Sequence, residues 1–77
     1  MTPPSIGHIV IFESAEVFNG ATKHPAIITR VWGPECVNLQ VFPDCAPPFV
    51  KTSVMLDSEA NANGYGTWRW PERLPTF

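Results

Sequence analysis

The chain is short of charged residues, of cysteine and of long apolar runs, and each shortage excludes a class of protein. Only 16% of its 77 residues are charged, with five Lys and Arg against seven Asp and Glu. No basic residues cluster, so we expect no generic nucleic acid binding, which needs a basic stripe. No segment is long enough to span a membrane, and the N-terminus lacks the basic and apolar regions of a signal peptide. We therefore expect a cytoplasmic protein that does not bind a membrane.

Residues that carry catalysis or hold metals are equally scarce. Cys36 and Cys45 are the only cysteines, and they lack the C-x-x-C spacing of a zinc or redox site. We expect both thiols to be free and buried in a reducing cytosol, with a disulfide as the less favoured alternative. No catalytic triad, metal set or phosphate loop is present. The sequence therefore predicts a protein that is not an enzyme and has no metal or cofactor.

What the chain does have favours short strands and ordered loops. Hydrophobic residues make up 44% of the sequence, and nine prolines stand against five glycines. Leucine is rare, and no long helix-forming run occurs. We expect one domain over residues 1–77, near the lower size limit for a stable core, which a homo-oligomer would relieve.

Apolar and β-branched runs mark five expected strands, and a polar loop is expected between the first two. The strands are expected at residues 7–12, 25–32, 36–42, 50–56 and 64–70. Residues 13–24 read as a long connection that contains the turn signal Asn19-Gly20. This pattern predicts an all-β fold, a small five-stranded SH3-like barrel, with an OB-like barrel as the runner-up.

The segment 64–71 holds two of the three tryptophans and the only tyrosine, Tyr65. Alternation in a strand puts Trp68 and Trp70 on one face and Thr67 and Arg69 on the other. The two indoles either form the wall of the core or line a binding surface, and the small size of the chain favours the core. Arg69, on the opposite face, is then the first place to look for a ligand.

Two other strands carry polar candidates. Alternation places Arg30 on the face of Ile28 and Trp32, where its guanidinium either lies across the indole or contacts an anion. Asn38 and Gln40 share the outer face of the next strand, where they either solvate the sheet or read a base or sugar edge. His8 is a minor candidate, because a structural role at the strand end is favoured over contact with a ligand.

Four motifs occur in order along the chain: Gly7 to Phe12, Pro25 to Thr29, Val37 to Phe42, and Gly66-Thr67-Trp68-Arg69-Trp70-Pro71. Together they resemble a group of short phage and prophage proteins whose last motif commonly reads Gly-Thr-Trp-His-Trp-Pro. This chain has Arg69 where the group often has histidine. The resemblance implies a phage accessory protein, and by analogy an anti-defence protein.

These observations predict a phage-encoded, non-enzymatic binding protein. It would act as a sponge that sequesters a small anionic, nucleotide-like host defence signal, because aromatics stack on bases and arginines pair with phosphate. The candidate ligand-binding residues are Arg69, Arg30, Trp68, Trp70, Thr67, Asn38, Gln40 and Tyr65. The alternative is an SH3-like protein-interaction module that binds a host protein through the face of Trp68 and Trp70.

Overall fold

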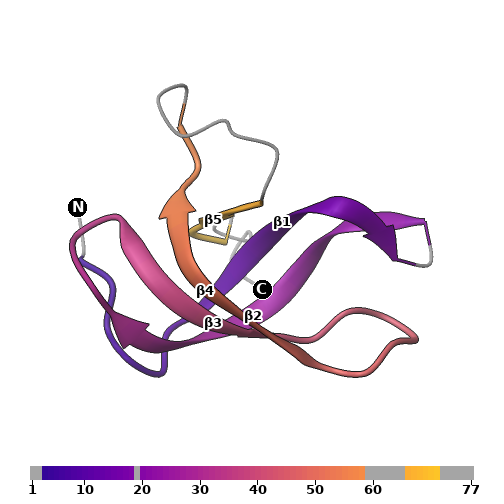
Figure 1. Ribbon diagram of the computed structural model, residues 1–77, viewed down its shortest axis with the longest axis horizontal. Coiled ribbons are helices and arrows are strands. Elements are labelled where there is room, and N and C mark those ends of the chain that lie inside the picture. The colour runs from indigo at the N-terminus through magenta and orange to yellow at the C-terminus, as the bar shows by residue number, and fades with distance from the viewer. Residues whose placement is uncertain (1–2, 19, 59–65, 72–77) are drawn as a thin grey trace, which may run out of the picture.

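The protein folds into a closed five-stranded barrel (Figure 1). The structure is a computed structural model and describes residues 3–18, 20–58 and 66–71. The strands are β1 (Ile9–Phe18), β2 (Ala21–Val31), β3 (Cys36–Val41), β4 (Phe49–Leu56) and β5 (Thr67–Arg69). The described residues form no helix, and so none that is long and apolar enough to cross a membrane. The predicted all-β fold, a small five-stranded barrel of the SH3-like kind, is confirmed.

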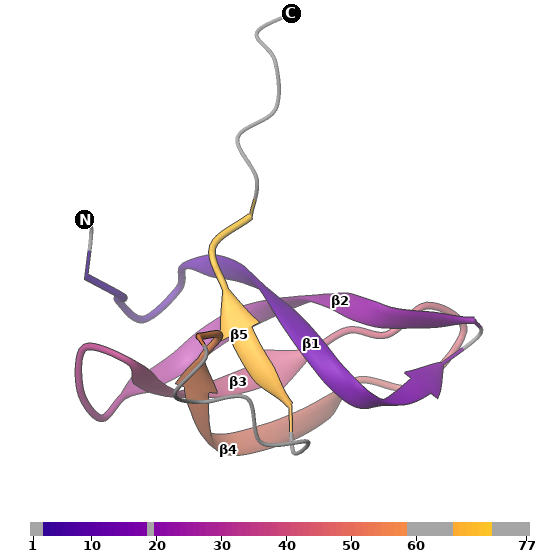
Figure 2. The same cartoon turned by 90° about the horizontal axis from the view of Figure 1, so that it is seen from above.

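The strands pair in the order in which they follow along the chain. β1, β2, β3 and β4 form successive antiparallel pairs. β5 closes the barrel by pairing antiparallel with β1 and parallel with β4, and Figure 2 shows it beside β1. Because an OB-fold connects its strands as a Greek key, this simple order favours the SH3-like interpretation over the runner-up.

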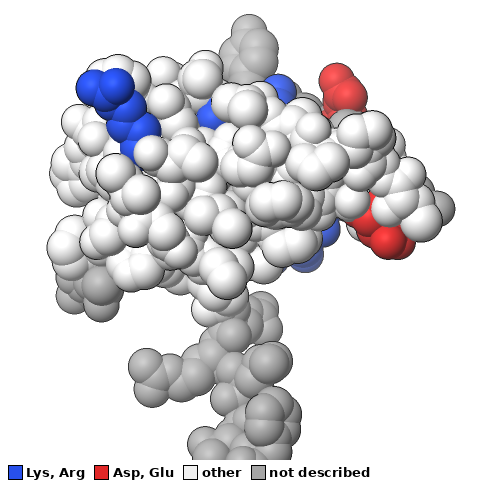
Figure 3. Space-filling view, turned by 90° about the horizontal axis from the view of Figure 1, so that it is seen from below, with Lys and Arg blue, Asp and Glu red and all other residues white. Residues whose placement is uncertain are grey.

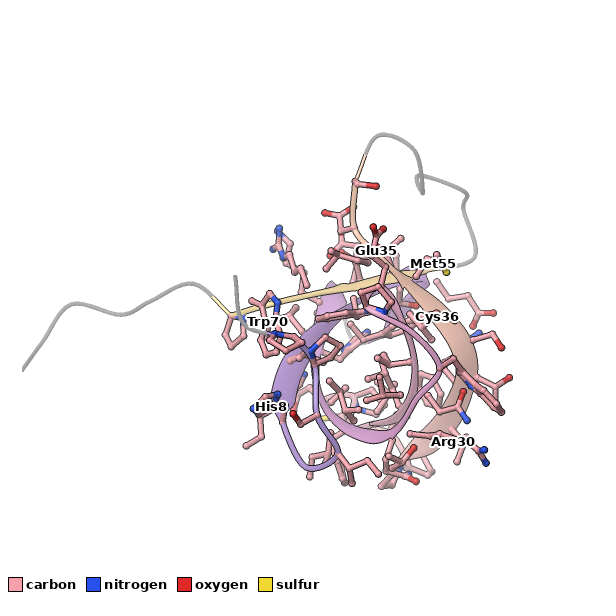
Figure 4. All side chains as sticks on the ribbon, turned by 90° about the vertical axis from the view of Figure 1, so that its left-hand side faces the viewer. His8, Arg30, Glu35, Cys36, Met55 and Trp70 are labelled. Carbon is pink, nitrogen blue, oxygen red and sulfur yellow. The ribbon has the colours of Figure 1, made fainter. Side chains whose placement is uncertain are left out.

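Alternating side chains of the strands fill the barrel, as Figure 4 shows in a view along it. β3 follows the predicted alternation: Val37, Leu39 and Val41 are fully buried, and the residues between them are half-buried on the outer face. The other buried apolar residues are Val10, Phe12, Ala26, Ile28, Val54 and Trp68. Burial of each large side chain contributes about 1.5–3 kcal/mol, so this small set is the main source of stability.

The expected loop at residues 13–24 is wrong, because most of it belongs to a long β1–β2 hairpin. β1 pairs with β2 from Ile9 to Glu13 and again at Phe18, opposite Ala21, with an irregularity between these regions. The hairpin extends away from the barrel in Figure 1. Gly20 has φ +81°, which fits the turn signal, but the polar residues around it continue the two strands. Polar residues are compatible with strand pairing here because the hairpin reaches beyond the core.

Gly66 brings the chain into β5 at a place where no side chain fits. It has φ +103°, a conformation that residues with a Cβ rarely adopt. A Cβ at this position would lie 2.6 Å from Cζ of the buried Phe12 ring. The close approach of the backbone to Phe12 therefore requires glycine.

Candidate functional site

The predicted site residues fall into two separate groups. Thr67, Arg69 and Trp70 come from β5 and the residue after it, whereas Arg30, Asn38 and Gln40 come from β2 and β3. Arg69 is in register with Ile11 on β1, and Ile11 with Pro25 on β2, five residues before Arg30. With strands about 4.8 Å apart and a rise of about 3.3 Å per residue, the two arginines are roughly 15–20 Å apart along the surface. They do not form one site.

Trp68 belongs to the core and cannot contact a ligand from this position. Its side chain is fully buried, and Nε1 donates a hydrogen bond to the carbonyl oxygen of Glu35 at 2.9 Å. Trp70 is half-buried and packs edge-on against Trp68, with ring centroids 5.4 Å apart. The expectation that the two indoles share one face is therefore confirmed, and Trp68 is corrected from a candidate ligand contact to the barrel wall.

Trp70 also contacts His8, which directly precedes β1. The two rings meet edge-to-face with centroids 5.2 Å apart, and both are half-buried. His8 Nδ1 accepts a hydrogen bond from the backbone N–H of Ser5 at 3.1 Å. This bond ties the N-terminal segment to the ring, so the contacts of His8 fit the strand-end structural role that the sequence favoured.

Thr67 and Arg69, which alternate with Trp68 along β5, have surroundings that do not favour an anion. Thr67 is buried, and its hydroxyl donates to the carboxylate of Asp57 at 3.4 Å. Thr67 also lies in register with Glu13 on β1. Arg69 is half-buried and opposite Ile11. A negative ligand at Thr67 would meet two carboxylates, while Arg69 has apolar surface beside it. Tyr65 lies outside the described residues.

Arg30 and Trp32 form a stacked pair on the outer surface, which we call the Arg30–Trp32 platform. The guanidinium carbon lies 4.1 Å from the centroid of the indole, and Trp32 is 54% exposed. Arg30 was expected on the same face as Ile28, and this is wrong. The register of β2 against β3 shifts between Ile28 and Arg30, and this irregularity turns Ile28 inward and Arg30 outward.

Asn38 holds the indole of this platform in place. Its Oδ1 accepts hydrogen bonds from Trp32 Nε1 at 2.8 Å and from the backbone N–H of Ser53 at 2.9 Å. Ser53 has φ +53° and lies where β4 also shifts register against β3. Because one amide oxygen joins irregularities on both sides of β3, Asn38 positions the platform and its Oδ1 is already used within the protein.

Gln40 lies apart from the platform, in an apolar setting. It is half-buried and in register with Ile27 on β2 and with Val50 on β4, which is 62% exposed. Trp32, by contrast, was not among the candidate site residues. The signal that would have found it was its place two residues after Arg30, the spacing at which strand neighbours share a face.

The remaining reactive groups are the two cysteines and the charged side chains of the surface. Cys36 and Cys45 are both free, but Cys36 is half-buried and Cys45 exposed, so the expectation of buried thiols is wrong. No group of three or more His, Cys, Asp or Glu among residues 3–18, 20–58 and 66–71 could hold a metal ion. Figure 3 shows a face on which charged side chains are few and separated.

Comparison of the chain with protein family models, with curated proteins and with solved structures finds no match.

Proposed function

We propose that the chain is a non-enzymatic binding protein that holds a small anionic, nucleotide-like ligand on the Arg30–Trp32 platform. The observation that carries this proposal is the guanidinium stacked 4.1 Å over a half-exposed indole. An arginine in this position keeps the edge of its fork available for a phosphate, while aromatic surface beside it suits a base. Both chemical features of a nucleotide are thus addressed by two neighbouring side chains.

The platform is organised before any ligand arrives. The hydrogen bond from Trp32 Nε1 to Asn38 fixes the indole, and the stacking restricts the arginine. Side chains that are already ordered lose less conformational entropy on binding, which typically amounts to about 0.5–1.5 kcal/mol for each side chain. Two ordered side chains therefore give more affinity than the same residues on a mobile loop.

The size of the platform limits its affinity. Stacking of one base contributes about 1–3 kcal/mol, and hydrogen bonds to a charged group about 1.5–3 kcal/mol each. A net gain of about 4–7 kcal/mol corresponds to dissociation constants from about 1 mM to about 10 µM. Tighter sequestration needs contacts from outside the platform, and an oligomer that presents several platforms to one ligand would supply them.

The biological setting of the proposal comes from the resemblance to small phage proteins. In an infected cell, a binding protein without catalytic groups acts by lowering the free concentration of its ligand. A host defence signal built from nucleotides has the phosphates and bases that the platform suits. We therefore propose a cytoplasmic, phage-encoded sponge for such a signal.

Calorimetric titration with nucleoside monophosphates, cyclic dinucleotides and cyclic ADP-ribose isomers tests the proposal. The expected result is saturable binding of at least one of them, lost in Arg30→Gln and in Trp32→Leu. Arg69→Gln is the matched control, because it removes the same charge roughly 15–20 Å away. Absence of binding heat with every ligand up to millimolar concentration would refute the proposal, and loss of binding only in Arg69→Gln would move the site to β5.

A second candidate function is an SH3-like protein-interaction module, and the exposed apolar side chains favour it. Among the described residues the large exposed hydrophobic side chains are Ile6, Ile9, Val17, Trp32, Phe42 and Val50. Because Trp68 is buried, the docking surface would not be the predicted face of Trp68 and Trp70. Binding of proline-rich peptides that is lost in Trp32→Ala would support this function over nucleotide binding.

A further inference from the structure

The outer surface of β1 and β2 has a regular arrangement that the Arg30–Trp32 platform does not use. Its side chains alternate with buried ones, Val10 and Phe12 on β1 and His24 and Ala26 on β2. We call this surface the β1–β2 face, and its residues are Ile9, Ile11, Glu13, Lys23, Pro25 and Ile27. Ile9 is 62% exposed and has apolar neighbours on the same face, and a contiguous exposed apolar patch is typical of an interaction site.

The register of the two strands turns these residues into three cross-strand pairs. Ile9 is opposite Ile27, Ile11 is opposite Pro25, and Glu13 is opposite Lys23. Two rows are therefore apolar on both strands, and the third row carries a negative residue on β1 and a positive residue on β2. The face is therefore apolar over two rows, and in the third row its two strands carry opposite charges.

The second row continues onto the neighbouring strands. Arg69 on β5 is in register with Ile11, on the outer side of β1. Phe42, directly after β3, donates its backbone N–H to the carbonyl oxygen of Pro25 at 2.9 Å, on the outer side of β2. Phe42 is 38% exposed. A cation and an aromatic ring thus flank the apolar row at its two ends.

We propose that a second copy of this chain docks on the β1–β2 face around a two-fold axis that lies in the interface, along the line between β1 and β2. Such an axis places each residue of β1 against the residue of β2 that shares its row. Glu13 then meets Lys23 of the second copy, and Lys23 meets its Glu13. Every charged position on the face meets the opposite charge, and like charges do not face each other.

The same axis brings the flanking residues together in a favourable way. Arg69 of one copy faces Phe42 of the other, which is a cation–π arrangement. The apolar rows pack Ile9 and Ile11 against Ile27 and Pro25 of the second copy. Apolar residues therefore meet apolar residues in two rows, and opposite charges meet in the third. Because the face complements itself in this way, the proposed occupant is a second copy of this chain.

The size of the face also agrees with an interface between two copies. A standard interface takes about 800 Å² from each partner, or about 15% of the 5330 Å² surface of this chain. The β1–β2 face with its flanks Arg69 and Phe42 extends over four strands and can form the centre of such an interface.

Sedimentation equilibrium between about 1 and 500 µM tests this proposal. We expect a dimer whose dissociation constant rises at least about tenfold in Glu13→Lys and in Lys23→Glu, because each reversal puts like charges against each other twice. Lys51→Glu makes the same change of charge on β4, outside the face, and should leave dimerisation unchanged. A wild-type chain that stays monomeric at 500 µM, or dimerisation that Lys51→Glu weakens as much, would overturn the proposal.

Mixing the two reversed variants separates contact between copies from contact within one chain. Glu13→Lys and Lys23→Glu carry opposite charges on the whole third row, so an equimolar mixture should restore dimerisation to near the wild-type level. Glu13 and Lys23 are also neighbours within one chain, and a defect of that internal pair would not be repaired by mixing. Thermal unfolding of each variant alone confirms that the barrel is intact, and failure of the mixture of folded variants to dimerise would refute the interface.

Discussion

Replacing Gly66 with alanine should destabilise the barrel by an amount that the local geometry predicts. The positive φ of +103° disfavours any residue with a Cβ, at about 1–3 kcal/mol for a strained backbone position. The new methyl would also lie 2.6 Å and 2.7 Å from two carbons of the buried Phe12 ring. Overpacking of a filled core adds about 1–3 kcal/mol. The sum of about 2–6 kcal/mol is a large fraction of the roughly 5–15 kcal/mol that is typical of a whole domain.

Two other glycines serve as matched controls for this substitution. Gly20 has φ +81°, and a Cβ added there would have nothing within 4 Å, so Gly20→Ala tests backbone strain alone. Gly33 has neither a positive φ nor a close neighbour, and Gly33→Ala should change stability by less than about 0.5 kcal/mol. Urea denaturation should therefore rank the variants with Gly66→Ala as the least stable, Gly20→Ala as intermediate and Gly33→Ala close to the wild type.

The contact with Phe12 can be isolated by a second substitution. Phe12→Leu shortens the side chain beneath Gly66, so the double variant should be more stable than the sum of the two single effects predicts. An interaction energy of at least about 0.5 kcal/mol is expected for residues in contact. A clash with Phe12 is refuted if Gly66→Ala destabilises no more than Gly20→Ala, or if the effects of Gly66→Ala and Phe12→Leu are additive.

Three further experiments test other contacts. Asn38→Ala removes the acceptor for Trp32 and Ser53 and should lower the free energy of unfolding by about 1–3 kcal/mol. Asn38→Asp keeps an acceptor and should lower the free energy of unfolding less. Equal losses of the two variants in urea titrations would contradict the role of Oδ1. Trp68→Phe leaves a smaller ring and deletes the hydrogen bond to Glu35, so the free energy of unfolding should fall by about 2–4 kcal/mol. Trp70→Phe should lower the free energy of unfolding by less than half of that amount, because Trp70 is half-buried. Reaction with a thiol reagent should proceed in two phases, with the exposed Cys45 faster than the half-buried Cys36, and a single fast phase for both thiols would contradict their different exposures.

Alternation along the strands predicted much of the core, but it did not predict the irregularities at which the alternation of inward and outward side chains reverses. Val37, Leu39 and Val41 were identified because buried and half-buried residues alternate without interruption along β3. The face of Arg30 was wrong because an irregularity in β2 reverses the alternation, and nothing in the apolar pattern marks that position. A bulge is set by the curvature that closure of the barrel requires, and closure depends on strands far apart in the sequence.

The same holds for the candidate site: burial was predicted from the sequence, whereas hydrogen bonds to residues distant in the chain were not. A small barrel needs its largest side chains in the core, which favoured burial of Trp68, and the structure buries it completely. The dual role of Asn38 was missed because its partners, Trp32 and Ser53, are six and fifteen residues away on the two sides of β3. The sequence states which residues are polar, but only the paired strands determine which hydrogen bonds those residues already make.

The way in which β5 closes the barrel has a consequence for how the protein opens. A strand of three residues at the end of a domain would ordinarily fray independently of the rest. Here its central residue, Trp68, fills the core and bonds to Glu35 at the β2–β3 connection, so detachment of β5 empties the interior. It also leaves β1 and β4 with unpaired edges, which invite association with other chains. Release of this short strand therefore also removes the largest side chain of the core, which couples the opening of this edge of the barrel to the loss of its packing.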